Sequence, residues 1–172
     1  MDRETIKMTS IYQDNLQSRC PDLFNLAEYV LENANKNPTK KALEIISKFS
    51  SYSISFEELK SRVLKTGNAL IKLGLNRNDK ILLRLDNTVT FPIAYLGAIS
   101  VGIIPVPTSI NLTEYELMEL FKILQPEAII TSKPLSINLG NMKIISETEI
   151  KKLSFEGDEA NFEKGDPDRL AY

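Results

Sequence analysis

Short apolar runs alternate with longer amphipathic segments along most of the chain, and this pattern predicts an α/β domain. An almost wholly apolar segment, residues 88–102, predicts a buried helix that tolerates Pro92 in its first turn. Four other runs have strand length and are rich in β-forming residues: Lys80–Leu85, Ile103–Thr108, Glu127–Ser132 and Met142–Ser146. We therefore expect a mostly parallel sheet with right-handed crossovers and helices on both faces.

Four helix starts share one local signature, a capping side chain followed three positions later by Glu, with a hydrophobic pair around them. The capping pairs are Asn25/Glu28, Ser55/Glu58, Thr113/Glu116 and Ser146/Glu149. The second helix is expected to span Phe56–Leu73 and to end at Gly74. Its basic residues, which lie largely away from its apolar face, are predicted to form a solvated surface: Lys60, Arg62, Lys65 and Lys72.

The remaining segments predict the domain organisation. "KALEIIS" (residues 41–47) and "SYSISF" (51–56) are typical of an antiparallel hairpin. Pro105 and Pro107 predict a strand that is short or leaves its sheet early, because proline cannot donate to the ladder. We expect an N-terminal extension (1–23), an α/β subdomain (24–154), and an acidic surface connector followed by the start of a strand (155–172).

Composition and charge exclude several classes of function. The 172 residues are enough for one ordinary domain. The net charge of −2 predicts no general attraction to nucleic acid or to anionic lipid, and the lack of Trp argues against a base-stacking platform. Because His is absent, the commonest metal ligand and general base is missing. With one cysteine, no apolar signal core and no run long enough to span a membrane, we expect a cytoplasmic protein.

No short motif in the sequence carries chemistry by itself. "GAISVG" (Gly97–Gly102) has the glycine spacing of a phosphate loop, but it lacks the following Lys and Ser/Thr and runs from helix to strand. We expect Gly97 to permit close helix packing and Gly102 to cap the helix. The acidic residues between 158 and 168 lack the spacing of a calcium loop and predict a solvated surface.

Ligands of open α/β sheets bind outside the carboxyl ends of the strands. Those positions here are Asp86 and Asn87, Thr108–Asn111, and Thr131–Lys133. Asn87 could equally start the buried helix, and the Ser and Thr residues are predicted to form turns. The residues alone therefore predict an α/β domain and assign no catalytic, cofactor-binding or metal-binding residue.

A longer stretch, residues 79–132, resembles the N-terminal part of the AMP-forming acyl-CoA synthetases, which belong to the adenylate-forming ligase superfamily. "ISFEEL" is similar to the first core motif of that family, "YLGAISVGIIPVPTSINLT" is similar to the second, and "GDPDRLAY" resembles the segment that leads into its phosphate-binding loop. "LDNTVTFPIAYLGAISVGIIPVPTSINLT" is most similar to the benzoate-CoA ligase branch. Medium- and long-chain fatty acyl-CoA synthetases remain alternatives.

The resemblance implies the first subdomain of an enzyme's large N-terminal domain. The whole enzyme would use ATP, Mg²⁺ and CoA to convert a carboxylic acid, through an acyl-adenylate, into its CoA ester. The family's phosphate loop and catalytic Lys correspond to positions beyond Tyr172, so neither is assigned here. Ser100-Val101 stands where some relatives have a basic residue for the CoA phosphate, and no CoA contact is assigned. The residues that match family positions are predicted to be structural: Ser55, Glu58, Gly102 and Pro105.

The resemblance also implies that the 172 residues alone are inactive, pack against the remainder of their own chain, and can self-associate through an exposed sheet face or edge. One alternative is a free-standing, non-catalytic interaction module derived from the same subdomain, with a closed polar surface around Leu170–Tyr172. Another is an unrelated flavodoxin-like domain, which would bind a flavin or a nucleotide by itself.

Overall fold

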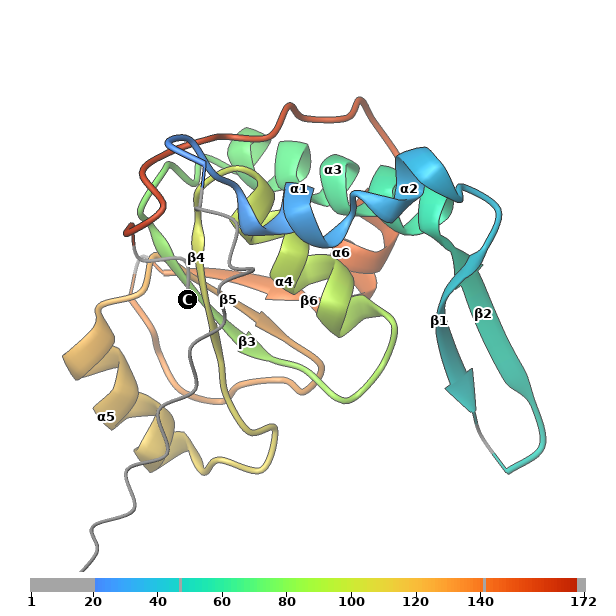
Figure 1. Cartoon of the computed structure of the whole chain (residues 1–172). Helices are drawn as coiled ribbons and strands as arrows, with labels where there is room; N and C mark the ends of the chain where they lie inside the picture. The colour runs from blue at the N-terminus through green and yellow to red at the C-terminus, as the bar shows by residue number, and fades with distance from the viewer. Residues whose placement is uncertain (1–20, 47, 141, 170–172) are drawn as a thin grey trace, which may run out of the picture.

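A four-stranded parallel sheet forms the centre of the molecule (Figure 1). The computed structural model describes residues 21–46, 48–140 and 142–169. The strand order is β4-β3-β5-β6, and every neighbouring pair is parallel. The strands are β3 (Lys80–Arg84), β4 (Ile104–Pro107), β5 (Ala128–Thr131) and β6 (Lys143–Ser146). The predicted α/β fold with a parallel sheet is confirmed.

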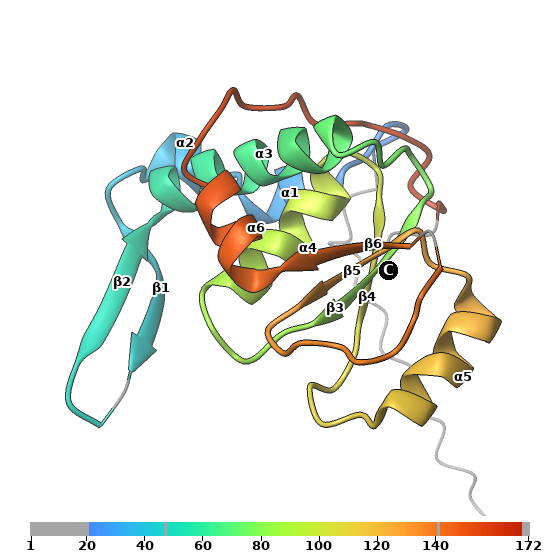
Figure 2. The same ribbon diagram turned by 180° about the vertical axis from the view of Figure 1, so that it is seen from behind.

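Helices cover both faces of this sheet, as predicted (Figure 2). The helix α5 (Glu114–Leu124) packs Leu117 and Phe121 against Leu82 and Ile129. Side chains alternate along a strand, so the neighbours of Leu82 point to the opposite face. There they meet α3 (Phe56–Lys72), α4 (Thr90–Ser100) and α6 (Glu147–Leu153). The sheet is therefore buried on both sides.

Glycines allow α3 and α4 to pack closely. A Cβ atom on Gly97 would lie 2.8 Å from Cγ2 of Thr66, and one on Gly67 would lie 2.6 Å from Oγ of Ser100. Any larger side chain at either position would push the two helices apart. Gly102 has a φ of 76° just beyond α4, which favours glycine. Both predicted roles, close packing at Gly97 and capping at Gly102, are confirmed.

The predicted helix starts are confirmed, although their details differ. Side chains of Asn25, Ser55, Thr113 and Ser146 all accept N-cap hydrogen bonds, and Thr113 with Glu116 forms a reciprocal capping box. The first cap precedes α1 (Leu26–Val30), and the sequence did not predict the short helix α2 (Asn33–Lys36) that follows. The predicted long helix ends one residue early, at Lys72, and Gly74 adopts a φ of 85° beyond it.

The predicted hairpin is also confirmed, and it projects from the body of the molecule (Figures 1 and 2). Its strands β1 (Lys41–Ile46) and β2 (Ser51–Ser55) pair antiparallel in a separate two-stranded sheet. The proline-containing strand β4 has four residues, as predicted for a short strand, and it lies at one edge of the main sheet.

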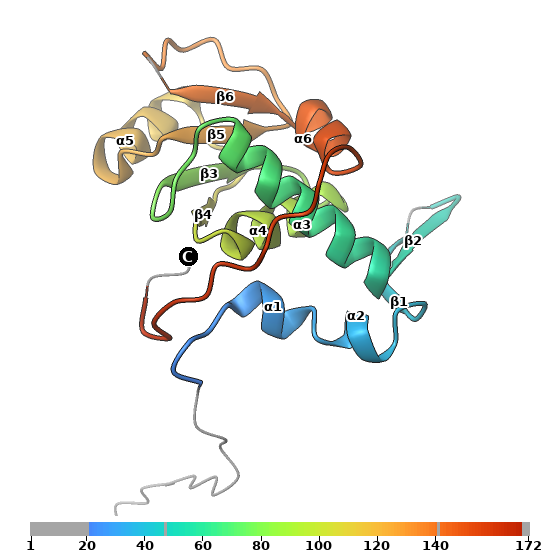
Figure 3. The same cartoon turned by 90° about the horizontal axis from the view of Figure 1, so that it is seen from above.

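Beyond α6, the chain returns along α3 toward α1 (Figure 3). In this connecting segment, residues 155–169, Ala160 N donates to Leu64 O, Glu163 N donates to Ser100 O, and Gly165 forms a β-bridge with Phe24. Glu163 also pairs with Arg77 at 3.1 Å. The segment lies on the surface as predicted, but it ties three helices together instead of forming a free acidic loop.

Two predictions concern residues outside the described part of the chain. The start of a strand at Leu170–Tyr172 falls there, and so does most of the N-terminal extension. The three-part division at residues 23 and 154 therefore stays a prediction. None of the described helices has both the length and the apolar character that crossing a bilayer requires.

Candidate functional site

The carboxyl ends of the parallel strands bring several of the predicted positions together at one edge of the sheet. Asp86 follows β3, and its backbone N–H donates to Oγ of Ser132, which follows β5, at 3.3 Å. Glu147, the first residue of α6, accepts hydrogen bonds from Ser132 Oγ at 2.6 Å and from Thr88 Oγ1 at 2.7 Å. One carboxylate thereby connects the segments that follow β3, β5 and β6.

The carboxyl group of Glu147 has a pKa below its ordinary value. Partial burial is the largest single influence and raises the pKa. Hydrogen bonds from Ser132, Thr88 and Thr90, with the positive charge of Lys151, act in the opposite direction and outweigh it. Glu147 is consequently an ionised, fully engaged carboxylate, suited to holding this edge in place. Little in the sequence indicated this role, because an acidic residue is common in the first turn of any helix.

A polar row lies at the same edge of the sheet, on the face that α5 covers. Arg84 pairs in register with Thr131, and Thr108 follows the last residue of β4. The row continues the apolar one formed by Leu82 and Ile129, because residues two apart along a strand share a face. Thus each of the three neighbouring strands places a polar side chain at its carboxyl end.

Arg84 is the most unusual member of this row. Its side chain is only 7% exposed, and Nη2 donates to the carbonyl oxygen of Leu112 at 3.1 Å. Nε and Nη1 are buried and have no hydrogen-bond partner. Arg84 was not among the positions expected to bind a ligand, although a charged residue inside the apolar run "KILLRL" was a signal that could have marked it.

The other predicted edge positions serve local structure. Thr131 Oγ1 accepts from Lys133 N and donates to Lys133 O, while Ser109 Oγ accepts from Asn111 N, as predicted for turn formers. Asn87 is exposed and does not cap the buried helix, whose N-cap is Val89.

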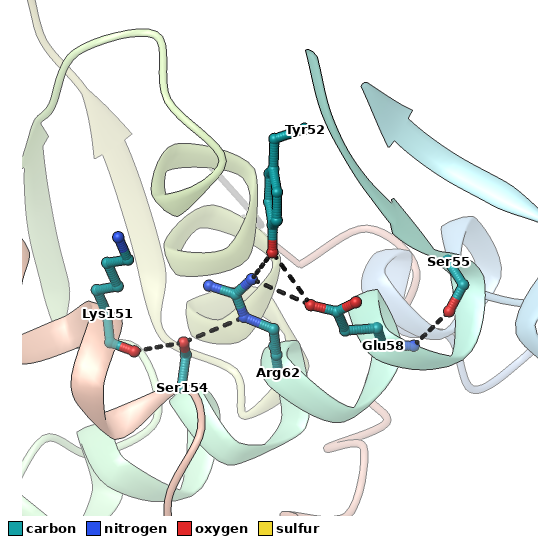
Figure 4. Close-up of polar contacts among 6 residues, drawn as sticks. All are labelled: Tyr52, Ser55, Glu58, Arg62, Lys151 and Ser154. Atoms are coloured by element: carbon teal, nitrogen blue, oxygen red, sulfur yellow. Dashed lines mark hydrogen bonds and ion pairs between the residues drawn. The ribbon is translucent and has the colours of Figure 1, made fainter. Parts of the chain in front are cut away.

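A second polar centre, next to the hairpin, corrects a prediction. Arg62 was expected on a solvated surface, but its side chain is 3% exposed (Figure 4). Its Nε donates to Ser154 Oγ at 3.3 Å, and its Nη1 lies 3.5 Å from Glu58 and 3.4 Å from the hydroxyl of Tyr52. The guanidinium also stacks 4.1 Å from the ring centre of Phe155. The reason is tertiary, because α6 and the hairpin cover this part of α3.

Arg62 also lines a pocket of about 590 Å³ between α2, α3 and the end of α6. The charged side chains around this pocket are three basic and three acidic residues, Lys60, Arg62, Lys65, Glu57, Glu58 and Glu159. Because the charges balance and Arg62 already has an acidic neighbour, the pocket shows no preference for an anion or a cation.

A metal site does not follow from these groups. Within residues 21–46, 48–140 and 142–169, no three acidic or cysteine side chains are placed to share a metal ion. The sequence also has no glycine-rich turn after a strand that could hold a nucleotide triphosphate. The described residues therefore offer no metal cluster and no phosphate loop, and no reaction step is assigned to them.

The parallel sheet with helices on both faces defines an α/β subdomain. The model of the family "AMP-binding enzyme" matches residues 30–171, and the chain belongs to that family. The predicted family membership is confirmed.

Individual relatives agree with this assignment. A segment of 61 residues is 43% identical to the 4-hydroxybenzoate–CoA/benzoate–CoA ligase of Rhodopseudomonas palustris and covers 36% of this chain and 11% of that enzyme. The solved benzoate CoA ligase of Burkholderia xenovorans LB400 superposes with a TM-score of 0.75 at 26% identity, over 87% of this chain and 32% of the other. The Klebsiella oxytoca NpsA N-terminal subdomain, solved with 3-hydroxybenzoyl-AMSN, has the same fold, with a TM-score of 0.73 at 16% identity over 84% of this chain and 35% of the other.

Proposed function

We propose that this chain forms the N-terminal subdomain of an ATP-dependent, AMP-forming ligase that joins a carboxylic acid to CoA. The observation that carries the proposal is the AMP-binding family match over residues 30–171. The 43% identity to a benzoate–CoA ligase favours an aromatic acid, and benzoate is the first substrate to test. In this reaction ATP activates the acid as an acyl-adenylate with release of pyrophosphate, and the acyl group then passes to CoA.

We further propose that the 172 residues do not turn over by themselves. The matched segment spans about a tenth of the benzoate–CoA ligase, and no three acidic or cysteine side chains of the described residues are placed to share a metal ion. Their contribution would be architectural, since the sheet edge held by Glu147 would support groups from the rest of the enzyme. ATP, Mg²⁺ and CoA would bind to the complete enzyme, in the cytoplasm.

The alternative is a free-standing interaction module without catalysis. The hairpin has strongly exposed apolar side chains, since Ile46 is 78% exposed and Phe49 is 88% exposed. These side chains are compatible with the enzyme subdomain and with the interaction module. Surface of this kind favours contact with further protein, either the rest of an enzyme or a second copy of the chain. Sedimentation of the purified chain across a concentration range would report self-association directly.

The deciding experiment starts with the intact mass of the protein in its native cell. If the mass greatly exceeds 19.4 kDa, the complete protein is assayed for AMP and benzoyl-CoA formation from benzoate, ATP and CoA. Acid-dependent AMP release with formation of a CoA ester supports the proposal. A mass of 19.4 kDa, or a complete protein that releases no AMP with aromatic or aliphatic acids, contradicts it and favours the interaction module.

A further inference from the structure

Arg84 is a buried cation that lacks a counter-charge. Its side chain is 7% exposed, and none of the ion pairs found among the described residues includes it. Nε and Nη1 carry three of the five N–H donors of the guanidinium, and both atoms are buried without an acceptor. Burying a charge is costly unless it is paired and hydrogen-bonded. The guanidinium of Arg84 therefore lacks hydrogen-bond acceptors for two of its nitrogen atoms.

The second buried arginine of the described chain shows what compensation looks like. Arg62 has Glu58 at 3.5 Å, the hydroxyl of Ser154 at 3.3 Å, and the ring of Phe155 at 4.1 Å. Arg84 has one neutral carbonyl, that of Leu112. Arg62 also has one buried nitrogen without a partner, Nη2, whereas Arg84 has two, Nε and Nη1. The two residues are alike in burial and differ in their counter-charge, so Arg62 serves as a matched reference.

The surroundings of Arg84 contain acidic residues, but these are engaged elsewhere. In the first turn of α5, directly after Leu112 and the N-cap Thr113, Glu114 accepts from the backbone N–H of Ser136 at 2.8 Å. Glu116 accepts from the backbone N–H and the hydroxyl of Thr113 in the capping box. Neither carboxylate neutralises the guanidinium.

The position of Arg84 is the one where open α/β sheets bind ligands. It is the last residue of β3, and it stands between Thr108 and Thr131 on one face at the carboxyl edge. The row of apolar side chains beneath it, formed by Val106, Leu82 and Ile129, provides a floor of low polarity. An oxyanion would interact more strongly with Arg84 there than in water.

We propose that Arg84 anchors a binding site for an oxyanion, the carboxylate or phosphate group of a small ligand, at the carboxyl edge of the sheet. The unpaired Nε–H and Nη1–H groups donate to the anion, while the hydroxyls of Thr108 and Thr131 keep their bonds to the carbonyl oxygens of Leu83 and Lys133. The free nitrogens are covered, so the ligand can reach them only when a loop moves aside. This loop is residues 108–112, and its Leu112 carbonyl oxygen accepts the hydrogen bond from Nη2. The site is argued from the surroundings of Arg84 and does not depend on the proposed ligase activity.

The test is thermal unfolding of the 172-residue chain in separate titrations with phosphate and acetate, at constant ionic strength set with chloride. A bound anion raises Tm in a saturable way. Phosphate also stabilises many proteins non-specifically, so the readout is the difference between the wild type and Arg84→Met, which keeps a similar volume without the charge. We expect Arg84→Met to bind at least roughly tenfold more weakly, since hydrogen bonds to a charged group are lost. In chloride it should match or exceed the wild type in stability, because an uncompensated buried charge is gone.

The matched control is Arg62→Met. This variant should unfold more easily, because Glu58 loses its partner, and it should keep the wild-type response to the anion. A response to phosphate alone assigns a phosphate site, and a response to acetate alone assigns a carboxylate site. An equal, saturable response in the wild type and Arg84→Met, or no saturable response in the wild type, overturns the proposal.

A second measurement covers the case in which Arg84→Met does not fold. The Nε–H resonance of Arg84, assigned by its loss in Arg84→Lys, should shift on titration with phosphate or acetate while that of Arg62 stays in place. An Arg84 resonance that does not move at anion concentrations that raise Tm would overturn the proposal.

Discussion

Asn25 tests how much one buried amide contributes to the stability of the fold. Its side chain is 1% exposed, and its Oδ1 accepts from the backbone N–H groups of Ala27 at 2.9 Å and Glu28 at 3.2 Å. Its Nδ2 donates to three carbonyl oxygens, those of Ile99 at 3.0 Å, Ser100 at 3.2 Å and Glu163 at 2.9 Å. One amide therefore caps α1 and clamps that helix to the end of α4 and to the connecting segment.

The loss expected for Asn25→Ala follows from these contacts. The cap contributes about 1 kcal/mol. Each neutral hydrogen bond contributes about 1 kcal/mol net, but Ser100 O and Glu163 O keep other donors, so the clamp contributes about 1–2 kcal/mol. The free energy of unfolding should fall by about 2–3 kcal/mol. Asn25→Ser keeps a capping oxygen and loses the clamp, so its free energy of unfolding should be about 1–2 kcal/mol below that of the wild type.

Urea denaturation of the wild type and both variants, followed by circular dichroism, measures these differences. Limited proteolysis of residues 155–169 supplies a local readout, because both variants should release this segment more readily. If the free energy of unfolding of Asn25→Ala lies within about 0.5 kcal/mol of the wild-type value, these hydrogen bonds do not stabilise the fold and the reasoning is wrong. If Asn25→Ala is strongly destabilised and Asn25→Ser is not, the helix cap alone accounts for the stability that Asn25 provides.

Three further predictions use the same denaturation assay. Gly97→Val should destabilise the chain by about 1–3 kcal/mol, since even a Cβ would lie 2.8 Å from Thr66, and a neutral result would refute the close packing of α3 on α4. Arg62→Gln should cost about 1–3 kcal/mol, because Ser154 and the partly exposed Glu58 lose a charged partner. Lys65→Gln, at a half-buried position of the same helix, should change stability by less than about 0.5 kcal/mol, and equal effects would restore the solvated-surface prediction. The pKa of Glu147 is lower in the folded state than in the unfolded state. Its contribution to the free energy of unfolding is therefore fully present above the unfolded-state pKa, and it is lost as the pH falls through the folded-state pKa. Glu147→Gln should remove that part of the acid sensitivity, less than about 1 kcal/mol because solvent screens the group, and an unchanged pH profile would contradict this.

Local patterns along the chain were sufficient for the elements of the fold. Four N-caps, the glycines beyond α3 and α4, the buried helix and the short edge strand all follow from interactions between residues near each other in sequence. The same holds for the parallel sheet, because strands that alternate with helices have few ways to pair. The short helix α2 escaped prediction because it has no side-chain cap to mark its start.

The surroundings of individual polar and charged side chains could not be predicted in this way. Asn25 reads as an ordinary cap in the sequence, and its three bonds to residues 99, 100 and 163 exist only because α4 and the connecting segment arrive beside it. Arg62 reads as part of a basic helix face until α6 and the hairpin cover it, and Arg84 and Glu147 acquire their surroundings from neighbouring strands. The preferences for helix and strand come from residues that are close in sequence, so they are already present in the unfolded chain. Burial and counter-charge depend on which distant segments meet, and only the assembled sheet and helices decide that.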